Sequence, residues 1–361
     1  MARQLASIQK IINIEPIEGA DAIEKATVLG WQVVIAKKDN FKIGDMAIYI
    51  EIDSIMPEKP EYEFLRQRKF RVRTIKLRNT ISQGLILPLS VLPKGNYHEG
   101  KDVTELLAVR KYDPQAEIEQ RLFDEKNARE KNKIKKLLGK MKWYRKLFGK
   151  KREGFPSFIK KTDEDRIQLF PDICEEEKDT AFQVSEKIDG QSGTYFLVKS
   201  KGWFGKTKFV FGVCSRNLLL RKPDNSSYWS IARKYNIEQV LKNLIDKSNY
   251  VILQGEIIGT NIQGNKYKVS DYEFFAFNLI FSDQKPDNDL AKSILEWHAI
   301  KFVPLLDNNL KLKSTIQDMV EYSNGKSQIS DTLREGVVVR NYEKGISFKI
   351  VSPEFLLKYN E

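Results

Sequence analysis

Hydrophobic and polar residues alternate in short runs between residues 6 and 107. The apolar runs fall at residues 8–14, 27–36, 46–52, 71–77 and 81–87, and most of them are separated by glycine or proline. Alternation with a period of two indicates half-buried strands, and several short strands at this spacing are typical of a small Greek-key barrel. The pattern therefore predicts a β-barrel domain over residues 1–110.

One of these predicted strands carries alternating bases. Arg71 and Arg73 flank Val72, so both guanidinium groups would lie on one face of a strand. Such a face could follow the phosphates of a nucleic acid, or it could be an ordinary solvated face of a small barrel. The sequence leaves both interpretations open.

A helical pattern replaces the alternation after residue 113. Apolar side chains recur at spacings of three and four, with lysines at many of the positions between them, at Ile134, Leu137, Leu138, Met141, Tyr144 and Phe148. This spacing predicts a basic amphipathic helix within a linker over residues 111–154. The helix could be an arm that binds phosphates, a helix lying on a membrane surface, or a solvated helix that covers a core.

Strands and helices follow one another in irregular order from residue 155 onward. Alternating or apolar runs predict strands at 184–188, 193–198, 208–214, 250–258, 274–280, 337–340 and 345–351, and helical periodicity predicts helices at 228–247, 289–299 and 315–322. This order predicts an α+β domain with mostly antiparallel sheets over residues 155–361. The sequence has no P-loop and no dinucleotide-binding glycine motif, so any nucleotide would have to be held by scattered side chains.

The positive charge of the chain is concentrated in one place. The formal net charge is +12, and residues 126–152 contain thirteen Lys and Arg but only one acid, Glu130. The rest of the chain is therefore close to neutral. A basic segment of this kind points to a polyanionic partner, either nucleic acid or an acidic membrane surface.

Other features of the composition bear on cofactors and location. Cys174 and Cys214 are the only cysteines, and they lie far apart in the chain, so we expect two small buried thiols and neither a disulfide scaffold nor a zinc site. No apolar run approaches the ~20 residues of a membrane span, and the first ten residues lack a signal-peptide core. We expect a cytoplasmic, monomeric protein without a membrane partner.

The stretch FQVSEKIDGQSGT at residues 182–194 carries the candidate chemistry. In a strand over 184–188, Lys187 and Asp189 would share one face, while Gly190 would end the strand with a turn. In such a pair, the lysine could act as a nucleophilic amine and the carboxylate could organise a metal ion beside it. Taken alone, the motif could equally be a surface strand that ends in an ordinary turn.

Further motifs place this stretch in a family context. KIDG resembles the adenylylation motif of the covalent nucleotidyltransferases, the superfamily of polynucleotide ligases and mRNA capping enzymes. The later motifs of that superfamily follow in order, as SRN at 215–217, GE at 255–256, FFAFN at 274–278, EGVV at 335–338 and SFKI at 347–350. The stretches at 44–57, 70–89 and 155–168 resemble the RNA ligases that carry an N-terminal OB domain.

This resemblance implies an activity and the roles of several residues. It implies an ATP-dependent RNA ligase that seals 3′-OH and 5′-phosphate RNA ends, including those of a nicked duplex, through a lysyl-adenylate and an adenylylated 5′ end. Lys187 would be the nucleophile, Asp189 would order a Mg²⁺ or Mn²⁺ ion together with Glu256 and Glu335, and Lys349 would add positive charge beside the amine and the α-phosphate.

The resemblance also implies how the nucleotide is held. The contacts would come from Glu186, Arg216, Glu256, Phe277, Glu335 and Lys349, with Phe277 stacked on adenine, Glu256 on the ribose hydroxyls and Arg216 on the nucleotide and then the RNA end. Two positions depart from the pattern of the superfamily. Asn278 stands where Asp is frequent, and Val351 stands where a second lysine is frequent.

Two alternatives remain at this point. A DNA ligase or a capping guanylyltransferase would share the same core motifs, but the barrel precedes the catalytic domain here, which argues against a capping enzyme. A non-catalytic OB-fold protein that binds nucleic acid would explain the barrel but not the ordered motifs. Covalent labelling by ATP would distinguish the enzyme from the binding protein.

Overall fold

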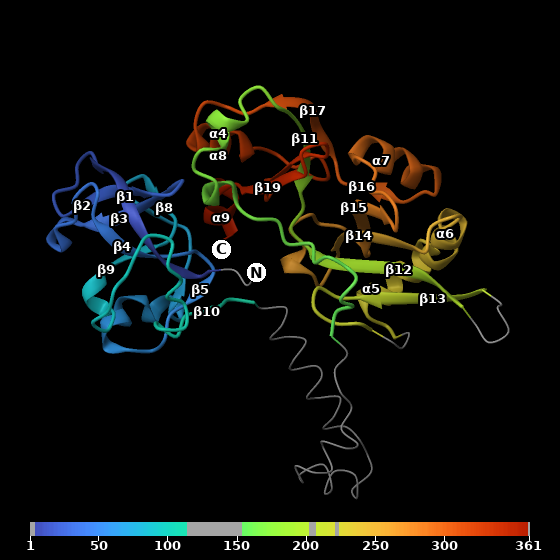
Figure 1. Ribbon diagram of the computed structural model, residues 1–361, viewed down its shortest axis with the longest axis horizontal. Helices are drawn as coiled ribbons and strands as arrows, with labels where there is room; N and C mark the ends of the chain where they lie inside the picture. Colours follow the sequence, from blue (N-terminus) through green and yellow to red (C-terminus); the bar gives the residue numbers. More distant parts are fainter. Residues whose placement is uncertain (1–3, 114–153, 202–206, 221–223, 360–361) are drawn as a thin grey trace, which may run out of the picture.

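The computed structural model describes residues 4–113, 154–201, 207–220 and 224–359. The chain forms two lobes, and the last strand and helix of the chain lie between them (Figure 1). The basic segment 126–152 and the helix predicted around it lie outside the described residues. The same is true of Trp203, Phe204 and Gly205.

The first lobe is built of antiparallel strands, as the alternation predicts. Five strands form its main sheet in the order β3-β2-β1-β4-β9, namely β1 (Ala6–Pro16), β2 (Ile23–Val28), β3 (Trp31–Ala36), β4 (Met46–Ile50) and β9 (Leu85–Pro88). A second sheet, β10-β5-β6, and a hairpin, β7-β8, complete the lobe with β5 (Ser54–Ile55), β6 (Arg71–Val72), β7 (Ile75–Leu77), β8 (Thr80–Ser82) and β10 (Arg110–Lys111). Short 3-10 helices at Lys37–Asp39, Pro60–Arg68 and Leu89–Val91 connect these strands.

Three predicted strands of this lobe are each divided in two. Residues 27–36 form the hairpin of β2 and β3, because Leu29 takes a positive φ of 51° in the turn before Gly30. Residues 71–77 divide into β6 and β7, and residues 81–87 divide between β8 and β9. Gly84 stands at that last division with φ of 121°, and a Cβ there would lie 2.4 Å from the ring of Tyr49. Glycine is therefore required at this position.

The second lobe contains two sheets. The first has the order β17-β11-β18-β19, and the second has the order β13-β12-β14-β15-β16. Their strands are β11 (Ala181–Lys187), β12 (Gln191–Lys201), β13 (Thr207–Cys214), β14 (Tyr250–Ile258), β15 (Glu273–Phe281), β16 (Lys301–Phe302), β17 (Leu305–Lys311), β18 (Gly336–Asn341) and β19 (Ile346–Val351). All pairings between these strands are antiparallel except that of β15 with β16, so the predicted α+β class is confirmed.

Helices cover these sheets. They are α4 (Ile173–Glu176), α5 (Ser227–Lys234), α6 (Ile237–Leu244), α7 (Asn288–Trp297), α8 (Ile316–Ser323) and α9 (Pro353–Tyr359), with 3-10 turns at Ile167–Leu169 and Gln263–Asn265. The predicted helix at 228–247 is two helices, because Asn236 lies between them with a left-handed φ of 47°. Helices α5, α6 and α7 pack their apolar faces on the larger sheet, where Tyr195, Leu253 and Phe274 are fully buried.

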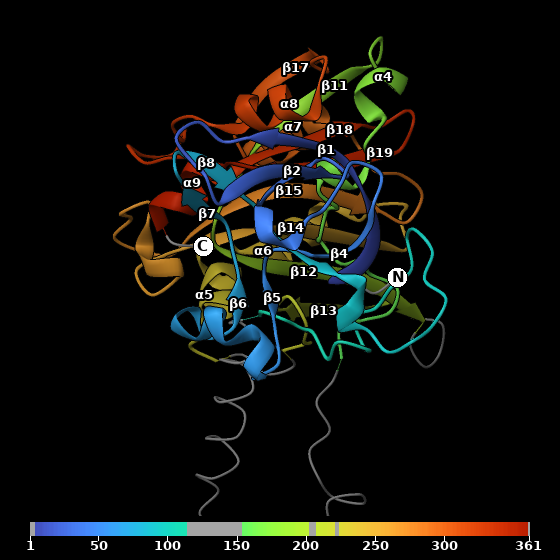
Figure 2. The ribbon, with the colours of Figure 1, turned by 90° about the vertical axis from the view of Figure 1, so that its left-hand side faces the viewer.

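The two lobes share one hydrophobic core. Trp31 and Tyr49 of the first lobe are buried together with Val351, Phe355 and Leu356, which come from the end of β19 and from α9. Both views show α9 and β19 beside the sheet of the first lobe (Figures 1 and 2). The last strand and helix of the catalytic lobe therefore complete the core of the barrel.

Removal of the Phe355 side chain should destabilise both lobes. Phe355 is fully buried, and replacement of a buried Phe by Ala costs about 3–5 kcal/mol because the site loses apolar burial and gains a cavity. We expect Phe355→Ala to lower the free energy of unfolding in urea by this amount. Phe64→Ala is the matched control, because Phe64 is 60% exposed and should change stability by less than ~0.5 kcal/mol.

Candidate active site

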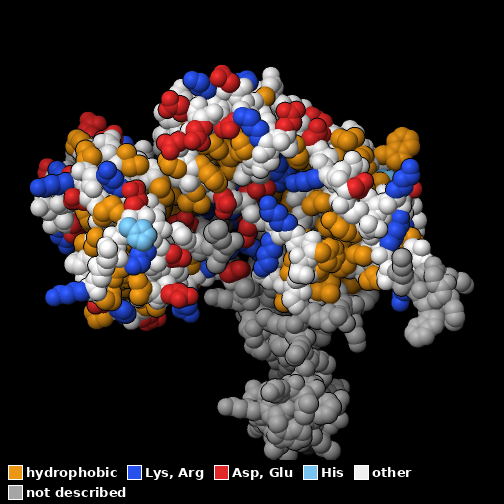
Figure 3. Space-filling view, in the orientation of Figure 1, with side chains coloured by type: hydrophobic (Ala, Val, Ile, Leu, Met, Phe, Trp, Pro, Cys, Tyr) orange, Lys and Arg blue, Asp and Glu red, His pale blue; other side chains and the backbone are white. Residues whose placement is uncertain are grey.

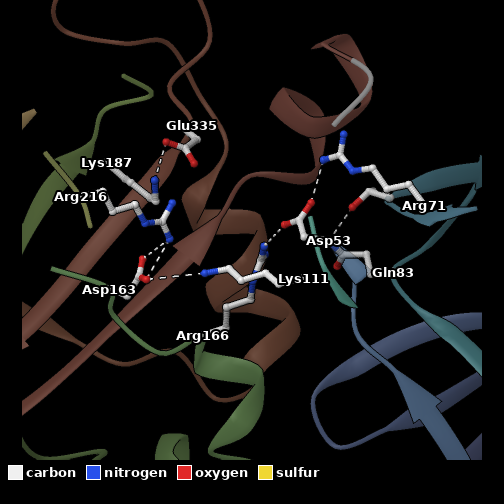
Figure 4. A network of polar contacts seen from close by, with 10 residues as sticks. Asp53, Arg71, Gln83, Lys111, Asp163, Arg166, Lys187, Arg216 and Glu335 are labelled. Atoms are coloured by element: carbon white, nitrogen blue, oxygen red, sulfur yellow. Dashed lines mark hydrogen bonds and ion pairs between the residues drawn. The ribbon is translucent and has the colours of Figure 1, made fainter. Parts of the chain in front are cut away.

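Strand pairing brings three motifs together around Lys187. Lys187 ends β11 and pairs with Gly336 of β18, which places the preceding residue, Glu335, beside the lysine. Ser192 of β12 pairs with Glu256 of β14, so Glu256 approaches from the second sheet. The site therefore lies where the two sheets meet, on the side that faces the first lobe (Figure 4).

Lys187 forms an ion pair with Glu335. Lys187 Nζ lies 2.5 Å from Glu335 Oε2, and both side chains are largely buried. Burial alone would lower the pKa of Lys187, but the negative charges of Glu335, Glu256 and Asp189 raise this pKa above the ordinary value. The resemblance implies Glu335 at the metal site beside this amine, and the register of β11 on β18 sets that carboxylate against it. The positive charge that Lys349 would add beside the amine stays a prediction.

Glu256 adds to the negative charge of the site. Burial, together with the negative charges of Glu335 and Asp189, raises the pKa of the Glu256 carboxyl to about 8 against the opposing charge of Lys187. The turn after Asp189 packs closely on β14, because a Cβ on Gly190 would lie 2.4 Å from the carbonyl oxygen of Ile257. Glu335 thus contacts the amine directly, and Glu256 and Asp189 act on it electrostatically.

Asp189 is held by a loop that sequence reasoning missed. Asp189 Oδ2 lies 2.5 Å from Lys266 Nζ, and both side chains are more than nine-tenths buried. The backbone N–H of Asp189 donates to the hydroxyl oxygen of Tyr267 at 2.8 Å. Lys266 and Tyr267 lie in a polar stretch between β14 and β15 without periodicity, so the sequence offered no signal for them.

Arg216 is held by an acidic residue of the segment before β11. Arg216 Nη2 donates to both carboxylate oxygens of Asp163, at 2.7 and 2.8 Å, and Lys111 Nζ lies 3.8 Å from the same carboxylate (Figure 4). Burial alone would raise the pKa of Asp163. The charge and hydrogen bond of Arg216, with Lys349 and Lys111, hold this pKa well below its usual range.

Lys349 lies on β19 near Asp163. Its backbone N–H donates to the carbonyl oxygen of Asp165 at 2.7 Å, and Lys349 pairs with Arg166 in a parallel bridge. As the alternation predicts, Phe348 and Ile350 are buried on the other face of the strand. The structure therefore places the lysine on the site side of the sheet, next to the acidic segment.

Glu186 takes a different place from the other predicted residues. Its carboxylate accepts hydrogen bonds from Ser327 Oγ at 2.5 Å and from the backbone N–H of Gln328 at 2.8 Å. Because neighbouring residues of a strand point to opposite faces, this side chain lies on the other face of β11 from Lys187. It anchors the loop that precedes Glu335.

Phe277 sits at an irregularity of β15. Gln254 pairs with Asn278 and Gly255 pairs with Ala276, so Phe277 is the extra residue of a β-bulge. Bulges re-aim side chains next to active sites. The carbonyl oxygen of Phe277 accepts a hydrogen bond from Arg340 Nη1 at 3.0 Å, which holds the bulge in place.

A single polar segment, residues 160–168, contacts most of these motifs in succession. Its partners in chain order are Gln254, Asn217, Ser192, Arg216, Arg340, Lys349, Asp53 and Gly30. We call it the crossing segment, because it runs from the larger sheet to the first lobe. Its sequence resembles the RNA-ligase branch, but the role of its individual residues could not be deduced from the sequence.

The crossing segment ends in a buried charge cluster between the lobes. Asp53 Oδ1 lies 2.7 Å from Arg71 Nη2, and Asp53 Oδ2 lies 3.3 Å from Arg166 Nη2 (Figure 4). Arg71 also lies over the ring of Tyr112, with 3.7 Å from Cζ to the ring centroid. Arg71 is therefore held within the first lobe, by a carboxylate that also contacts Arg166 of the crossing segment. Its contact with the phosphates of a nucleic acid stays a prediction.

Charged side chains gather in the hollow between the lobes. Figure 3 shows basic and acidic side chains facing one another there, whereas hydrophobic side chains are more frequent on the surface of the catalytic lobe. None of the helices in the described ranges is both long and apolar enough to cross a membrane.

The arrangement of a buried lysine, surrounding carboxylates and a neighbouring barrel defines the covalent nucleotidyltransferase class.

Comparisons with known proteins agree with this class. A family model for an OB-fold domain matches residues 5–89, and one for RNA ligase matches residues 180–359. The structure of Naegleria gruberi RNA ligase with pyrophosphate is similar at a TM-score of 0.80 and 33% sequence identity, over 99% of each chain. A mutant of that ligase with ATP and Mn is similar at a TM-score of 0.79 and 31% identity, over 99% of this chain and 100% of that one.

No curated protein sequence matches. The structural similarity over nearly the full length is nevertheless decisive, because identity above 30% accompanies it. The chain belongs to the RNA ligase family. The first lobe is an OB-fold, as the alternating pattern and the resemblance predicted.

Proposed function

We propose that this protein is an ATP-dependent RNA ligase that joins a 3′-OH end to a 5′-phosphate end, with Lys187 as the covalent nucleophile. The observation that carries the proposal is the pairing of Lys187 Nζ with Glu335 Oε2 at 2.5 Å, among two further carboxylates, at the junction of the sheets. The similar Naegleria gruberi enzymes include complexes with pyrophosphate and with ATP and Mn. Pyrophosphate is the product that adenylylation of a lysine releases.

In the first step, Lys187 attacks the α-phosphorus of ATP. The ammonium gives up one proton to become an amine, and Glu335 Oε2 lies where it can accept this proton. A phosphorus–nitrogen bond then forms as the bond to pyrophosphate breaks, and the nitrogen loses a second proton. Lys349 and Arg216 supply positive charge near the transferred phosphate.

The residues fit a divalent cation. Asp189, Glu256 and Glu335 all act electrostatically on Lys187. Burial is the main cause of the raised pKa of Glu256, and the charges of Glu335 and Asp189 add to it, so a cation would relieve the repulsion between these carboxylates. A Mg²⁺ or Mn²⁺ ion would supply charge that stabilises the phosphate and favours the neutral amine. Within the described residues, no three acidic, His or Cys side chains converge on a single point.

In the later steps, the adenylate passes to the 5′-phosphate of the RNA and leaves when the 3′-OH attacks. Arg216 is the natural contact for the 5′ end, since it holds a carboxylate with one nitrogen at the mouth of the site and guanidinium groups bind phosphates in a similar geometry. The OB-fold would hold the RNA strand beside the site.

Covalent labelling tests this proposal. The purified protein should acquire an acid-labile label from α-³²P-ATP in the presence of Mg²⁺ or Mn²⁺, and no label from α-³²P-GTP. The labelled protein should then transfer adenylate to 5′-phosphate RNA. Absence of label from a folded protein with ATP, or labelling by GTP instead, would contradict the proposed nucleotide and mechanism.

Single substitutions at Glu335 and Lys349 should slow label formation strongly. Because both groups act on charge that develops in the transition state, we expect Glu335→Ala and Lys349→Ala each to reduce the rate about 10²- to 10³-fold. Lys344→Ala is a suitable control, because Lys344 lies at the solvent-exposed turn that precedes β19. A Lys349→Ala protein that labels at the wild-type rate would show that this lysine has no role in adenylylation and is only a structural residue of β19.

A further inference from the structure

A short loop grips the Asp189-Gly190 turn at three points. Lys266 Nζ lies 2.5 Å from Asp189 Oδ2, the Asp189 N–H donates to Tyr267 Oη at 2.8 Å, and Gln263 Nε2 donates to the Gly190 carbonyl at 3.4 Å. We call residues 262–269 the clamp loop. It therefore fixes both the side chain and the backbone of the carboxylate that neighbours the nucleophile.

The pair of Lys266 and Asp189 is buried. Their side chains are only 9% and 8% exposed, and each charge would be costly there without the other, because burial removes it from water. A lysine in a polar surface loop ordinarily keeps its ammonium group in water, whereas the ammonium group of Lys266 is buried against Asp189. Its neighbour Lys268 in the same loop is exposed to solvent.

The other side of Lys266 is braced by the C-terminal helix. Lys266 Nζ lies 5.0 Å from the ring centroid of Phe355 and 4.9 Å from that of Tyr359, both on α9. Aromatic faces attract cations at this distance. Tyr359 is itself fixed by a hydrogen bond of 2.6 Å between its hydroxyl and Thr332 Oγ1.

The backbone of the clamp loop is adapted to this task. Gln263, Asn265 and Lys268 take left-handed φ values of 46°, 50° and 54°, which are costly for residues with a side chain. The Asn265 side chain bonds both the N–H and the carbonyl of Val269, at 3.0 Å each, and closes the loop. Such strain persists only where the surrounding contacts fix the conformation.

From these contacts we propose that Lys266 is a positioning residue that holds the Asp189 carboxylate in the orientation needed for the divalent cation, with α9 as its brace. The inference rests on the proposed function, because it assigns Lys266 a task for a metal-organising Asp189. Lys266 holds Oδ2 while Tyr267 holds the backbone N–H of the same residue, so the two contacts together restrict the rotation of the carboxylate and the directions in which Oδ1 can point. Groups that orient a metal-organising residue affect metal affinity about 10- to 100-fold.

Mn²⁺ binding to the full-length protein without nucleotide tests the proposal. The dissociation constant can be measured from the electron paramagnetic resonance signal of free Mn²⁺, independently of catalysis. We expect Lys266→Met to weaken Mn²⁺ binding ~10- to 100-fold, Lys266→Arg to restore most of it, and Lys268→Met to match wild type. Wild-type or tighter Mn²⁺ binding by folded Lys266→Met protein would overturn the proposal. Such a result would mean that Lys266 does not assist the cation at Asp189 or that it competes with the cation for this carboxylate.

Two further variants keep the outcomes distinct. Asp189→Ala should weaken Mn²⁺ binding at least as much as Lys266→Met, and an unchanged affinity in Asp189→Ala would refute the role of Asp189 in the proposed function rather than that of Lys266 alone. Tyr267→Phe removes only the oxygen that accepts the Asp189 N–H and serves if Lys266→Met does not fold. A several-fold weaker Mn²⁺ affinity in Tyr267→Phe would support the clamp, and wild-type affinity would overturn it.

Discussion

Lys187→Ala should abolish covalent labelling by ATP and all sealing of RNA with plain 5′-phosphate ends. The substitution removes the only group that we assign as the nucleophile, so neither the lysyl-adenylate nor the steps that depend on it can form. The same protein should still join RNA that is already adenylylated at its 5′ end, because that step uses the carboxylates and Arg216 but not the amine. Label formation and sealing are measured side by side, with each RNA.

Two controls make this result specific. Lys187→Arg keeps a positive charge against Glu335, but a guanidinium stays protonated and cannot attack, so it should fold as wild type and acquire no label. Lys208→Ala removes an exposed lysine on β13 and should label normally. Acid-labile AMP on the Lys187→Ala protein would mean that another residue is the nucleophile.

Deletion of residues 1–110 should reduce self-adenylylation about 10²-fold or more, together with sealing. From the sequence alone, the barrel is expected to serve sealing mainly, because the nucleotide motifs lie downstream of it. The structure changes this expectation. Removal of Trp31 and its neighbours would expose Val351, Phe355 and Leu356, and β19, which carries Lys349, would lose its support. A displacement of about 1 Å at such a site can cost 10²-fold in rate.

A point substitution separates support from simple unfolding. Asp53→Ala leaves the barrel in place but removes the carboxylate that joins Arg71 to Arg166. The buried Arg166 and the partly buried Arg71 then lose this partner. We expect labelling to fall together with sealing in Asp53→Ala, while circular dichroism shows folded protein. Loss of sealing with labelling unchanged would instead show that the first lobe acts on RNA alone.

The sequence predicted the long elements well and the short ones poorly. The strand expected at 250–258 is β14, because a buried apolar run leaves few alternatives, and the expected helix at 315–322 is α8 shifted by one residue. Strand β16 was missed because two residues show no period, and helix α9 was missed because seven residues make only about two turns. Strand β17 was missed because the polar run at 307–309 interrupts its alternation. The division of residues 228–247 depends on a left-handed Asn236, a conformation set by tertiary packing.

The sequence predicted those site residues that belong to short contiguous motifs, and it did not predict residues that reach the site from elsewhere in the chain. Lys187, Glu256, Glu335 and Lys349 were named from the sequence, and strand register brings the first three together. The sequence did not indicate which charges would be neighbours, so the direct ion pair of Lys187 with Glu335 could not be deduced from it. Asp163 and Lys266 act across long separations in the chain, and no periodicity or spacing marks them.

The core shared by the lobes has a consequence for synthesis of the chain. The barrel residues up to Tyr49 leave the ribosome early, whereas Val351, Phe355 and Leu356 follow about three hundred residues later. At ~5–20 residues per second this delay is on the order of tens of seconds. During that interval the nascent barrel presents an apolar face to which chaperones can bind. A message truncated before β19 would yield a barrel whose apolar face stays exposed, because β19 and α9 would be missing.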